Sequence, residues 1–420
     1  MKVLLLNTSE RTGGAAVAAS RLLNALRKAG IAVRLLVRDK QTADPDVAAV
    51  STTYVGRKID FVRFVWERLI IYVCNRFSRK NLFQVSLADT GTNISRLGLV
   101  READVIHLHW INHGFLSLQD IQRLLNTGKP IVWTLHDLWP ATGICHYPGA
   151  CTRYYGLCEK CPLMASHPLW DLARQVYRKK LQIDLSQITF VGCSRWIAGQ
   201  ARKSGLLQNA RFHSIPNPID TTVFKRMDKA EARRRFGLPA DRPLLLFAAA
   251  KVSDTRKGAA YLAEACRLLQ SRGRQDFGIV VMGNSSDELV HLFPCPVHAL
   301  GYMADPASIA AAYSCADLFI IPSLEDNLPN TVMEAMACGT PCIGFRTGGI
   351  PEMIDHRVNG YVAAYKDAAD LAAGIEWGLA PGEETARLSD ACLRKVESHY
   401  SETAVAEKYR LLYQRLVTQK

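Results

Sequence analysis

Residues 322–341 read PSLEDNLPNTVMEAMACGTP and connect two apolar runs, Leu318–Ile321 and Cys342–Phe345. Both runs are nearly continuous in apolar residues, which is typical of parallel strands buried on both faces of a sheet. Between them, a polar acidic loop leads into a helix that starts near Asn330, and the Gly-Thr-Pro sequence at 339–341 ends that helix. The stretch therefore predicts a strand–loop–helix–strand unit, with its loop at the sheet edge where ligands bind.

The same alternation of short apolar runs and longer helical patterns continues along the whole chain. It predicts right-handed crossovers and doubly wound parallel sheets. Four helices are expected at Ala15–Ala29, Lys257–Gln270, Ala307–Ser314 and Thr331–Ala337. The expected strands are Val3–Leu6, Val33–Val37, Val105–His109, Ile131–Leu135, Thr189–Cys193, His213–Ile215, Leu244–Ala248, Gly278–Met282, Val297–Leu300, Leu318–Ile321 and Cys342–Phe345.

Eleven expected strands are more than one twisted sheet usually holds. The turn at 217–220, followed by a charged helix, indicates where one sheet domain ends and the next begins. We therefore expect an α/β protein with two sheet domains that face each other across a cleft. The expected limits are 1–217 for the first domain, with a cysteine-rich insertion at 140–165, 218–400 for the second, and 401–420 for a C-terminal helix that crosses back to the first.

The 420 residues are 48% apolar and 22% charged, which is ordinary for a globular chain and argues against disorder, collagen or coiled coil. Residues 1–200 hold 26 Lys and Arg against 14 Asp and Glu, a net charge of +12. Residues 201–420 hold 26 against 25, a net charge of +1. The basic first half predicts an anionic partner, such as nucleic acid, phospholipid or a phosphorylated substrate.

The N-terminus, MKVLLLN, has too short an apolar run for a signal peptide, and no window of the chain is apolar enough to span a membrane. The sequence therefore predicts a cytosolic protein. One segment, 57–82, has aromatic and aliphatic residues around a helix with basic residues at both ends. It predicts either a basic amphipathic helix on the inner face of an anionic plasma membrane, or a helix packed on its own domain with a solvated face.

Two motifs of the first half follow predicted strands. Gly13 and Gly14 open a helix, where glycines let backbone N–H groups approach a phosphate, although a plain strand–helix turn also fits. His136 and Asp137 come just after Ile131–Leu135. A histidine there can hydrogen-bond a substrate hydroxyl, and the aspartate can orient it or carry charge, whereas the alternative is a structural histidine.

Two motifs of the second half also follow predicted strands. Lys251, Arg256 and Lys257 precede a helix, where positive charge opposes the helix dipole unless an anion binds, although a solvated basic loop also fits. In the 322–341 stretch, acidic side chains suit hydrogen bonds to sugar hydroxyls, and the amides of the helix start suit a diphosphate. The candidate residues of this stretch are Glu325, Asp326, Asn330, Thr331 and Glu334.

Four of the twelve cysteines, Cys145, Cys151, Cys158 and Cys161, fall within 17 residues. Four such thiols can form a tetrahedral structural zinc site, which would have no open position for catalysis. Reduced packed thiols and disulfides are the alternatives. The other eight cysteines are scattered and predict reduced core thiols. His107, His109 and His113 lie on and after a strand, and metal binding there is not favoured.

Taken together, the motifs resemble those of retaining glycosyltransferases of family 4, which have two facing Rossmann-like domains, the GT-B fold. The resemblance covers nearly the whole chain, and the WTLHDLWPATGICHYPGAC stretch is similar to a bacterial colanic-acid and exopolysaccharide subgroup. It is carried by Gly13-Gly14, His136-Asp137, IPNPID at 215–220, Arg256-Lys257-Gly258 and the block from Asp326 to Gly339.

The resemblance implies a metal-independent hexosyltransferase that uses a UDP- or GDP-sugar and a lipid-linked or oligosaccharide acceptor. Glu334 would bind the ribose hydroxyls, Asp326 the donor sugar, and Lys257 the departing diphosphate. From the first domain, Gly14 would approach the diphosphate and His136 the donor sugar.

This chain departs from the family pattern at two places. The family's Glu-x7-Glu spacing is Asp326-x7-Glu334 here, so the sugar contact can pass to Glu325. The usual arginine before the Lys-Gly pair is missing, which leaves Lys251 or Arg256 as the second cation.

Two other functions remain open at this point. A sugar-nucleotide epimerase on a similar fold would convert the donor without an acceptor. A zinc-stabilised nucleic-acid-binding protein would need clustered basic and stacking residues, whereas the positive charges are spread over 200 residues.

Overall fold

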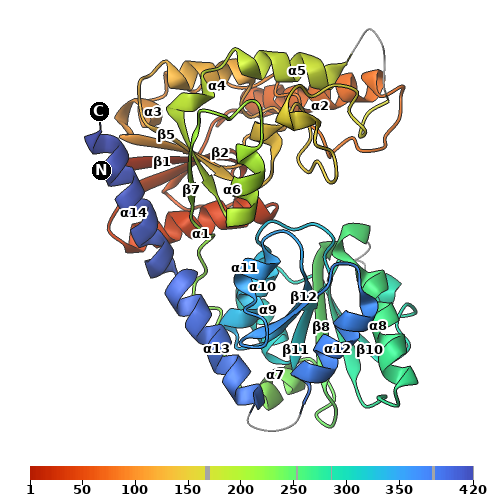
Figure 1. Ribbon diagram of the computed structural model, residues 1–420. Coiled ribbons are helices and arrows are strands. Elements are labelled where there is room, and N and C mark those ends of the chain that lie inside the picture. Colours follow the sequence, from red (N-terminus) through yellow and green to blue (C-terminus); the bar gives the residue numbers. More distant parts are fainter. Residues whose placement is uncertain (166–170, 252–253, 285, 381–383, 420) are drawn as a thin grey trace. The chain divides into compact units, whose positions relative to one another are not determined.

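The computed structural model describes residues 1–165, 171–251, 254–284, 286–380 and 384–419, and it divides into two compact units. Unit 1 comprises Met1–Pro216 and Val405–Lys420, and unit 2 comprises Asn217–Ala404. Each unit has one parallel sheet with helices on both faces (Figure 1), so the predicted α/β class with two Rossmann-like sheets is confirmed. Among the residues described, no helix is both long and apolar enough to cross a membrane.

The sheet of unit 1 has seven parallel strands in the order β3-β2-β1-β4-β5-β6-β7. Its central strands β4, β5 and β6 are mostly apolar and buried along their whole length, and β1 is buried from Val3 to Thr8, as a sheet covered on both faces requires. The strands are β1 (Lys2–Ser9), β2 (Ala32–Asp39), β3 (Val47–Ala49), β4 (Val105–Leu108), β5 (Ile131–Leu135), β6 (Ile188–Gly192) and β7 (Arg211–Ser214).

Two helix layers cover this sheet. One core includes α1 and the C-terminal helix α14, whose Tyr409 and Tyr413 pack against β1, β2 and β5. The other core includes α4, α5 and α6. The helices of the unit are α1 (Gly14–Lys28), α2 (Tyr54–Cys74), α3 (Gly98–Glu102), α4 (Leu118–Leu125), α5 (Leu172–Leu181), α6 (Arg195–Arg202) and most of α14 (Glu402–Thr418).

The sheet of unit 2 has six parallel strands in the order β10-β9-β8-β11-β12-β13. The strands are β8 (Leu244–Lys251), β9 (Gly278–Asn284), β10 (Val297–Gly301), β11 (Leu318–Ile321), β12 (Cys342–Phe345) and β13 (Gly360–Ala363). The helices are α7 (Lys229–Arg235), α8 (Ala259–Ser271), α9 (Pro306–Ser314), α10 (Asn330–Ala337), α11 (Ile350–Met353), α12 (Ala368–Gly378) and α13 (Glu384–His399).

The structure differs from the sequence-based expectation in two edge strands and in the start of one helix. Strands β3 and β13 were not expected; both are short edge strands, with too few residues to show a pattern. The helix expected from Lys257 begins two residues later, because Gly258 has a φ of +75° that no helix continues through. A short turn at Thr255–Lys257 takes its place.

Candidate functional site

Three loops of unit 2 meet at the carboxyl edge of its sheet. Leu324 N, in the loop after β11, donates a hydrogen bond to the Arg256 carbonyl in the loop after β8 (2.7 Å). Thr347 Oγ1, in the loop after β12, donates a hydrogen bond to the Leu324 carbonyl (3.1 Å). Gly349 N also donates to the Asp326 carbonyl at 3.1 Å. The neighbouring strands β8, β11 and β12 thus bring their loops to one place, which is where such sheets bind ligands.

Lys257 and Asp326 form an ion pair across two of these loops. Lys257 Nζ lies 2.7 Å from Asp326 Oδ2, and the two side chains are 30% and 16% exposed. The structure therefore joins two residues that the sequence analysis singled out separately. It leaves the lysine partly open to solvent, so an anion can reach its ammonium group.

Glu334 lies on α10, directly after the loop that follows β11. It is buried, and its Oε2 accepts a hydrogen bond from Tyr313 OH on α9 at 3.0 Å. Burial raises the pKa of Tyr313 well above its ordinary value, so this hydroxyl stays protonated and acts as the donor. Tyr313 was not expected from the sequence, because nothing in the pattern of α9 marks one of its buried residues as a partner of Glu334.

The other predicted residues of unit 2 are less firmly engaged. Glu325, Asn330 and Thr331 are half-buried. Asn330 Oδ1 accepts a hydrogen bond from Asn217 at 3.3 Å. Arg256 is exposed and forms an ion pair with Asp254 at 2.7 Å, and the side chain of Lys251 lies outside the described residues.

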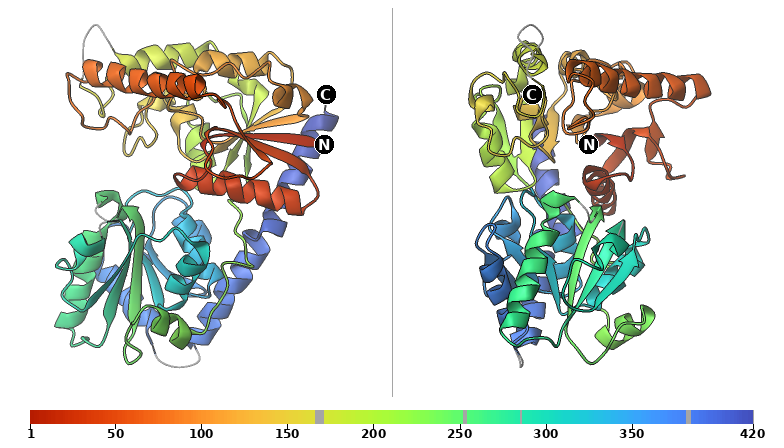
Figure 2. Two further views of the ribbon diagram at one scale, coloured as in Figure 1. Left: turned by 180° about the vertical axis from the view of Figure 1, so that it is seen from behind. Right: turned by 90° about the vertical axis from the view of Figure 1, so that its right-hand side faces the viewer.

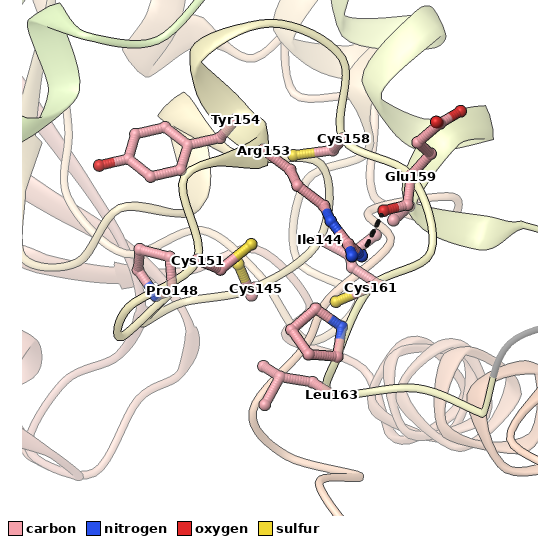
Figure 3. Close-up of a pocket in the computed structure, with 12 residues that line it drawn as sticks. Ile144, Cys145, Pro148, Cys151, Arg153, Tyr154, Cys158, Glu159, Cys161 and Leu163 are labelled. Atoms are coloured by element: carbon pink, nitrogen blue, oxygen red, sulfur yellow. Dashed lines mark hydrogen bonds between the residues drawn. The ribbon is translucent and has the colours of Figure 1, made fainter.

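In unit 1, the four clustered cysteines line one cavity, whose walls come mainly from the chain segment that connects β5 to α5 (Figure 3). Burial raises the pKa of Cys158 to about 11 and also raises the pKa values of Cys145 and Cys161. Each of the twelve cysteines is a free thiol. Within the described ranges, no three His, Cys, Asp or Glu side chains are arranged to hold a metal ion. The predicted zinc site therefore has no support in the structure.

His136 directly follows β5 and is held between residues at the ends of β4 and β6, the strands on either side of β5. Its Nε2 lies 2.9 Å from His109 Nδ1, just after β4, and its Nδ1 lies 3.6 Å from Cys193 Sγ, just after β6. Burial lowers the pKa of His136 to about 4, so the ring is neutral at physiological pH. It therefore carries no positive charge, and it would have to exchange one of these two contacts to hydrogen-bond a ligand.

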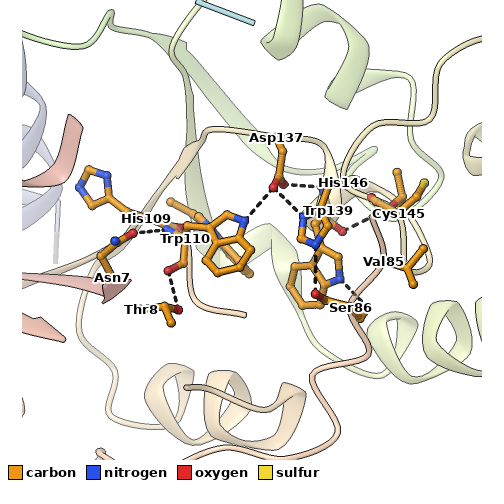
Figure 4. Close-up of polar contacts among 12 residues, drawn as sticks. Asn7, Thr8, Val85, Ser86, His109, Trp110, Asp137, Trp139, Cys145 and His146 are labelled. Carbon is orange, nitrogen blue, oxygen red and sulfur yellow. Dashed lines mark hydrogen bonds and ion pairs between the residues drawn. The ribbon is translucent and has the colours of Figure 1, made fainter. Parts of the chain in front are cut away.

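The Asp137 carboxylate holds the loop that follows β5 (Figure 4). It accepts hydrogen bonds from Trp110 Nε1 (2.9 Å), His146 Nδ1 (2.6 Å) and Trp139 N (2.9 Å). Burial acts to raise the pKa of Asp137, but His146 and these hydrogen bonds outweigh burial and lower it. The geometry therefore favours a positioning role for Asp137 next to His136.

Gly13 and Gly14 lie at the start of α1, after β1, and are exposed. Gly13 has a φ of +96°, and a Cβ atom there would meet nothing within 4 Å. The backbone at this helix start is thus open to a ligand.

His107, one of the three histidines considered for metal binding, belongs to the core of unit 1. Its two ring nitrogens each lie 2.7 Å from a hydroxyl, those of Tyr413 and Thr134. These contacts tie the C-terminal helix to the sheet.

Two family models match the chain and decide its family. The model described as Glycosyltransferase Family 4 matches residues 12–223, half of the chain, and the model described as Glycosyl transferases group 1 matches residues 242–380. The chain belongs to glycosyltransferase family 4. The resemblance stated from the sequence is thereby confirmed.

Several curated proteins are similar to this family 4 chain. A D-inositol 3-phosphate glycosyltransferase of Thermobispora bispora is 30% identical over 194 residues, which cover 43% of this chain and 45% of that protein. The amylovoran biosynthesis glycosyltransferase AmsK of Erwinia amylovora is 32% identical over 174 residues, 38% and 42% of the two chains. The putative colanic acid biosynthesis glycosyl transferase WcaC of Escherichia coli is 24% identical over 263 residues, 60% and 62%. The chain thus spans about half the length of the curated relatives it matches.

Solved structures share the fold of this family 4 chain. Sucrose-phosphate synthase from Thermosynechococcus elongatus has a TM-score of 0.69 at 20% identity, and each chain is covered completely. Anabaena HepE in complex with UDP and glucose has a TM-score of 0.65 at 15% identity, covering 99% of this chain and 100% of that one. At these identities the likeness establishes the GT-B fold.

Three histidines of unit 1, the buried His107 and the half-buried His113 and His136, are expected to make this unit of the family 4 chain sensitive to acid. Burial lowers the pKa values of His107 and His113 to about 3 and that of His136 to about 4. In the unfolded chain these groups bind protons near pH 6.5, so the unfolded state takes up more protons than the folded state as the pH falls. We expect each to cost on the order of 2 kcal/mol of folding stability between pH 7.5 and pH 5.

Thermal unfolding followed from pH 7.5 to pH 5 measures this effect. The melting temperature should fall with pH, and His136→Gln should reduce the size of the fall. A melting temperature that stays level over this range would contradict the lowered pKa values of the three rings.

Proposed function

We propose that this chain is a retaining glycosyltransferase that moves a sugar from a nucleoside-diphosphate sugar to a hydroxyl of a lipid-linked or oligosaccharide acceptor. The acceptor would belong to a bacterial exopolysaccharide or surface polysaccharide. The observation that carries the proposal is the loop cluster of unit 2, where Lys257 and Asp326 form a 2.7 Å ion pair and Glu334 lies in the first turns of the next helix.

The donor would bind across these loops. Lys257 would exchange its contact with Asp326 for one with the diphosphate, and the freed Asp326 carboxylate would accept hydrogen bonds from sugar hydroxyls. Glu334, oriented by Tyr313, would accept hydrogen bonds from the ribose. Glu325 can share the sugar contact, because Asp326 is one methylene shorter than the family's glutamate.

In the transfer, the bond between the anomeric carbon and the diphosphate oxygen breaks with its electron pair leaving on the phosphate. The acceptor oxygen forms its bond on the same face of the sugar, and its proton passes to the leaving phosphate oxygen. Lys257 and the amides at the start of α10 stabilise the developing negative charge. From unit 1, neutral His136 would hydrogen-bond the donor sugar, and Gly14 would approach the diphosphate.

The comparisons support the donor class. Anabaena HepE has been solved in complex with UDP and glucose, and also in complex with UDP-glucose. AmsK and WcaC are named for amylovoran and colanic acid biosynthesis, which supports a polysaccharide acceptor.

A panel of UDP- and GDP-sugars tests the proposal by thermal stabilisation. At millimolar concentration the matching donor should raise the melting temperature by several degrees, because a ligand at 100 times its Kd contributes about 2.7 kcal/mol. Glu334→Gln should reduce this shift, whereas Glu264→Gln, an exposed change on α8 of the same unit, should preserve it.

Two outcomes would count against the proposal. No stabilisation by any member of the panel would contradict the donor site. Conversion of the donor to an epimer without any acceptor would identify a sugar-nucleotide epimerase instead.

A further inference from the structure

Helix α2 packs on unit 1 through its charged face. Its buried residues are Asp60, Glu67, Arg68 and Ile71, three of them charged. Glu67 Oε1 accepts hydrogen bonds from the backbone N–H groups of residues 87 (2.6 Å) and 88 (3.1 Å), and Glu67 Oε2 lies 2.9 Å from Arg68. Asp60 pairs with Arg63 at 3.1 Å. The inner face of α2 is therefore fixed largely by polar contacts, and Ile71 joins the apolar core of unit 1.

The opposite face of α2 is apolar and exposed to solvent. Positions 55, 59, 62, 66, 69 and 73 repeat at helical spacing and are all exposed, Val55 by 66% and Trp66 by 50%. Eleven of the twenty large exposed apolar residues found among the described residues lie between positions 54 and 83. They are Tyr54, Val55, Ile59, Phe61, Val62, Val65, Trp66, Leu69, Val73, Phe77 and Phe83.

The exposed charges of the same segment are all positive. Its two acidic residues, Asp60 and Glu67, are buried and paired. Its exposed charged residues are Arg57, Lys58, Arg76, Arg79 and Lys80. We call these five residues and the eleven exposed apolar residues the α2 surface. An apolar stripe with cations around it departs from the usual surface of a monomeric protein.

We propose that the α2 surface binds an anionic phospholipid membrane, with α2 lying in the plane of the interface. The helix has 21 residues and is about 31 Å long, its apolar stripe from position 55 to 73 is about 27 Å long, and it lies on the outside of unit 1 (Figure 2). The apolar side chains would enter the boundary between headgroups and acyl chains, Tyr54 and Trp66 would lie at headgroup level, and the cations would meet lipid phosphates.

The charge of the surface favours a membrane over a second copy of the chain. A second copy would bring the same five cations against the first set, and like charges facing each other across an interface are unfavourable. An anionic bilayer offers both an apolar phase and the opposite charge. The sequence left open a helix packed on its own domain with a solvated face; α2 does pack on unit 1, and the face that it leaves to solvent is the apolar one.

Co-sedimentation with vesicles tests the proposal without donor or acceptor, so its outcome is independent of the proposed transfer reaction. The wild-type chain should bind vesicles of 70% phosphatidylcholine and 30% phosphatidylglycerol, and should bind pure phosphatidylcholine or high-salt samples far less. The double variant Val62→Ser and Trp66→Ser should lose binding by roughly tenfold or more. The triple variant Arg76→Gln, Arg79→Gln and Lys80→Gln should lose a similar amount.

Matched changes elsewhere on unit 1 provide the controls. Leu181→Ser with Leu411→Ser removes two exposed apolar side chains, and Lys28→Gln, Arg34→Gln and Lys203→Gln removes three exposed cations. Both control variants should bind like the wild type, and all variants should keep the wild-type melting temperature, because only exposed side chains change.

Three results would overturn the proposal. The first is wild-type chain that does not bind the anionic vesicles. The second is an equal loss of binding in the α2 variants and their controls. The third is a wild-type chain that forms a dimer, together with a Val62→Ser and Trp66→Ser variant that is monomeric but still binds vesicles. That result would assign the α2 surface to a second copy of the chain.

Discussion

Replacing Lys257 by alanine is expected to lower kcat for sugar transfer by roughly 10²- to 10³-fold, the usual cost of losing one preorganised group that stabilises developing charge. The ammonium group of Lys257 is held 2.7 Å from Asp326 at the carboxyl edge of the sheet. The negative charge on the departing diphosphate grows during the reaction, so the lost interaction is stronger in the transition state than in the ground state. We therefore expect a larger change in kcat than in KM for the donor.

Two further variants test whether the loss of kcat is specific to the positive charge at Lys257. Lys257→Arg keeps the positive charge and should recover part of the rate. Lys229→Ala removes another lysine of unit 2, which lies 2.6 Å from Asp317, and should leave kcat unchanged. Steady-state kinetics with the donor found in the panel measures all three variants. An unchanged kcat in Lys257→Ala would remove the lysine from the proposed mechanism.

The sequence predicts the central strands well because burial on both faces makes them continuously apolar. Strands β1 and β11 are examples, since the uninterrupted apolar runs Val3–Leu6 and Leu318–Ile321 have the length of a strand and are shorter than an ordinary helix. The edge strand β3 has three residues and β13 begins with a glycine, so neither carries a pattern that distinguishes a strand from a loop. Pairing with β2 and β12 decides their structure.

The positions of the candidate site residues could be predicted, but their partners could not. A polar residue in the loop that follows a buried strand lies at the ligand edge of a parallel sheet, and this rule singled out His136 after β5 and Asp326 in the loop after β11. The partner of His136 on one side, His109, is 27 positions away, and Cys193 on the other side is 57 away. Such contacts depend on the strand order β4-β5-β6, which the sequence does not contain in readable form.

The orientation of α2 is a second feature that the sequence alone does not decide. The sequence of residues 57–82 places Asp60, Arg63 and Glu67 on one helical stripe and apolar residues elsewhere around the helix, but it does not say which side faces the protein. The ordinary rule would bury the apolar stripe. Here the backbone N–H groups of residues 87 and 88 require an acceptor, and Glu67 supplies it at 2.6 and 3.1 Å. Satisfying buried backbone donors thus fixes the charged stripe inward.

Replacing Gly258 by alanine is expected to lower the free energy of unfolding of unit 2 by roughly 3–5 kcal/mol, which is in the range of severe core and backbone changes. Two causes add. The residue has a φ of +75°, which costs an alanine about 1–2 kcal/mol. A Cβ atom would also lie 1.9 Å from the Pro322 carbonyl oxygen, so the loops after β8 and β11 would have to separate.

Gly273→Ala separates these two causes, because Gly273 has a φ of +85° with nothing within 4 Å of its added Cβ. Gly273→Ala should lower the free energy of unfolding only by the cost of the positive φ, and it should keep donor binding. Denaturant unfolding gives the two free energies, and donor-induced thermal stabilisation reports the site. Gly258→Ala should lose that stabilisation as well, since Lys257 precedes the glycine directly and the Arg256 carbonyl contacts Leu324. Equal destabilisation in both variants, with donor binding kept, would show that the close approach of the two loops is not what holds the Lys257–Asp326 pair together.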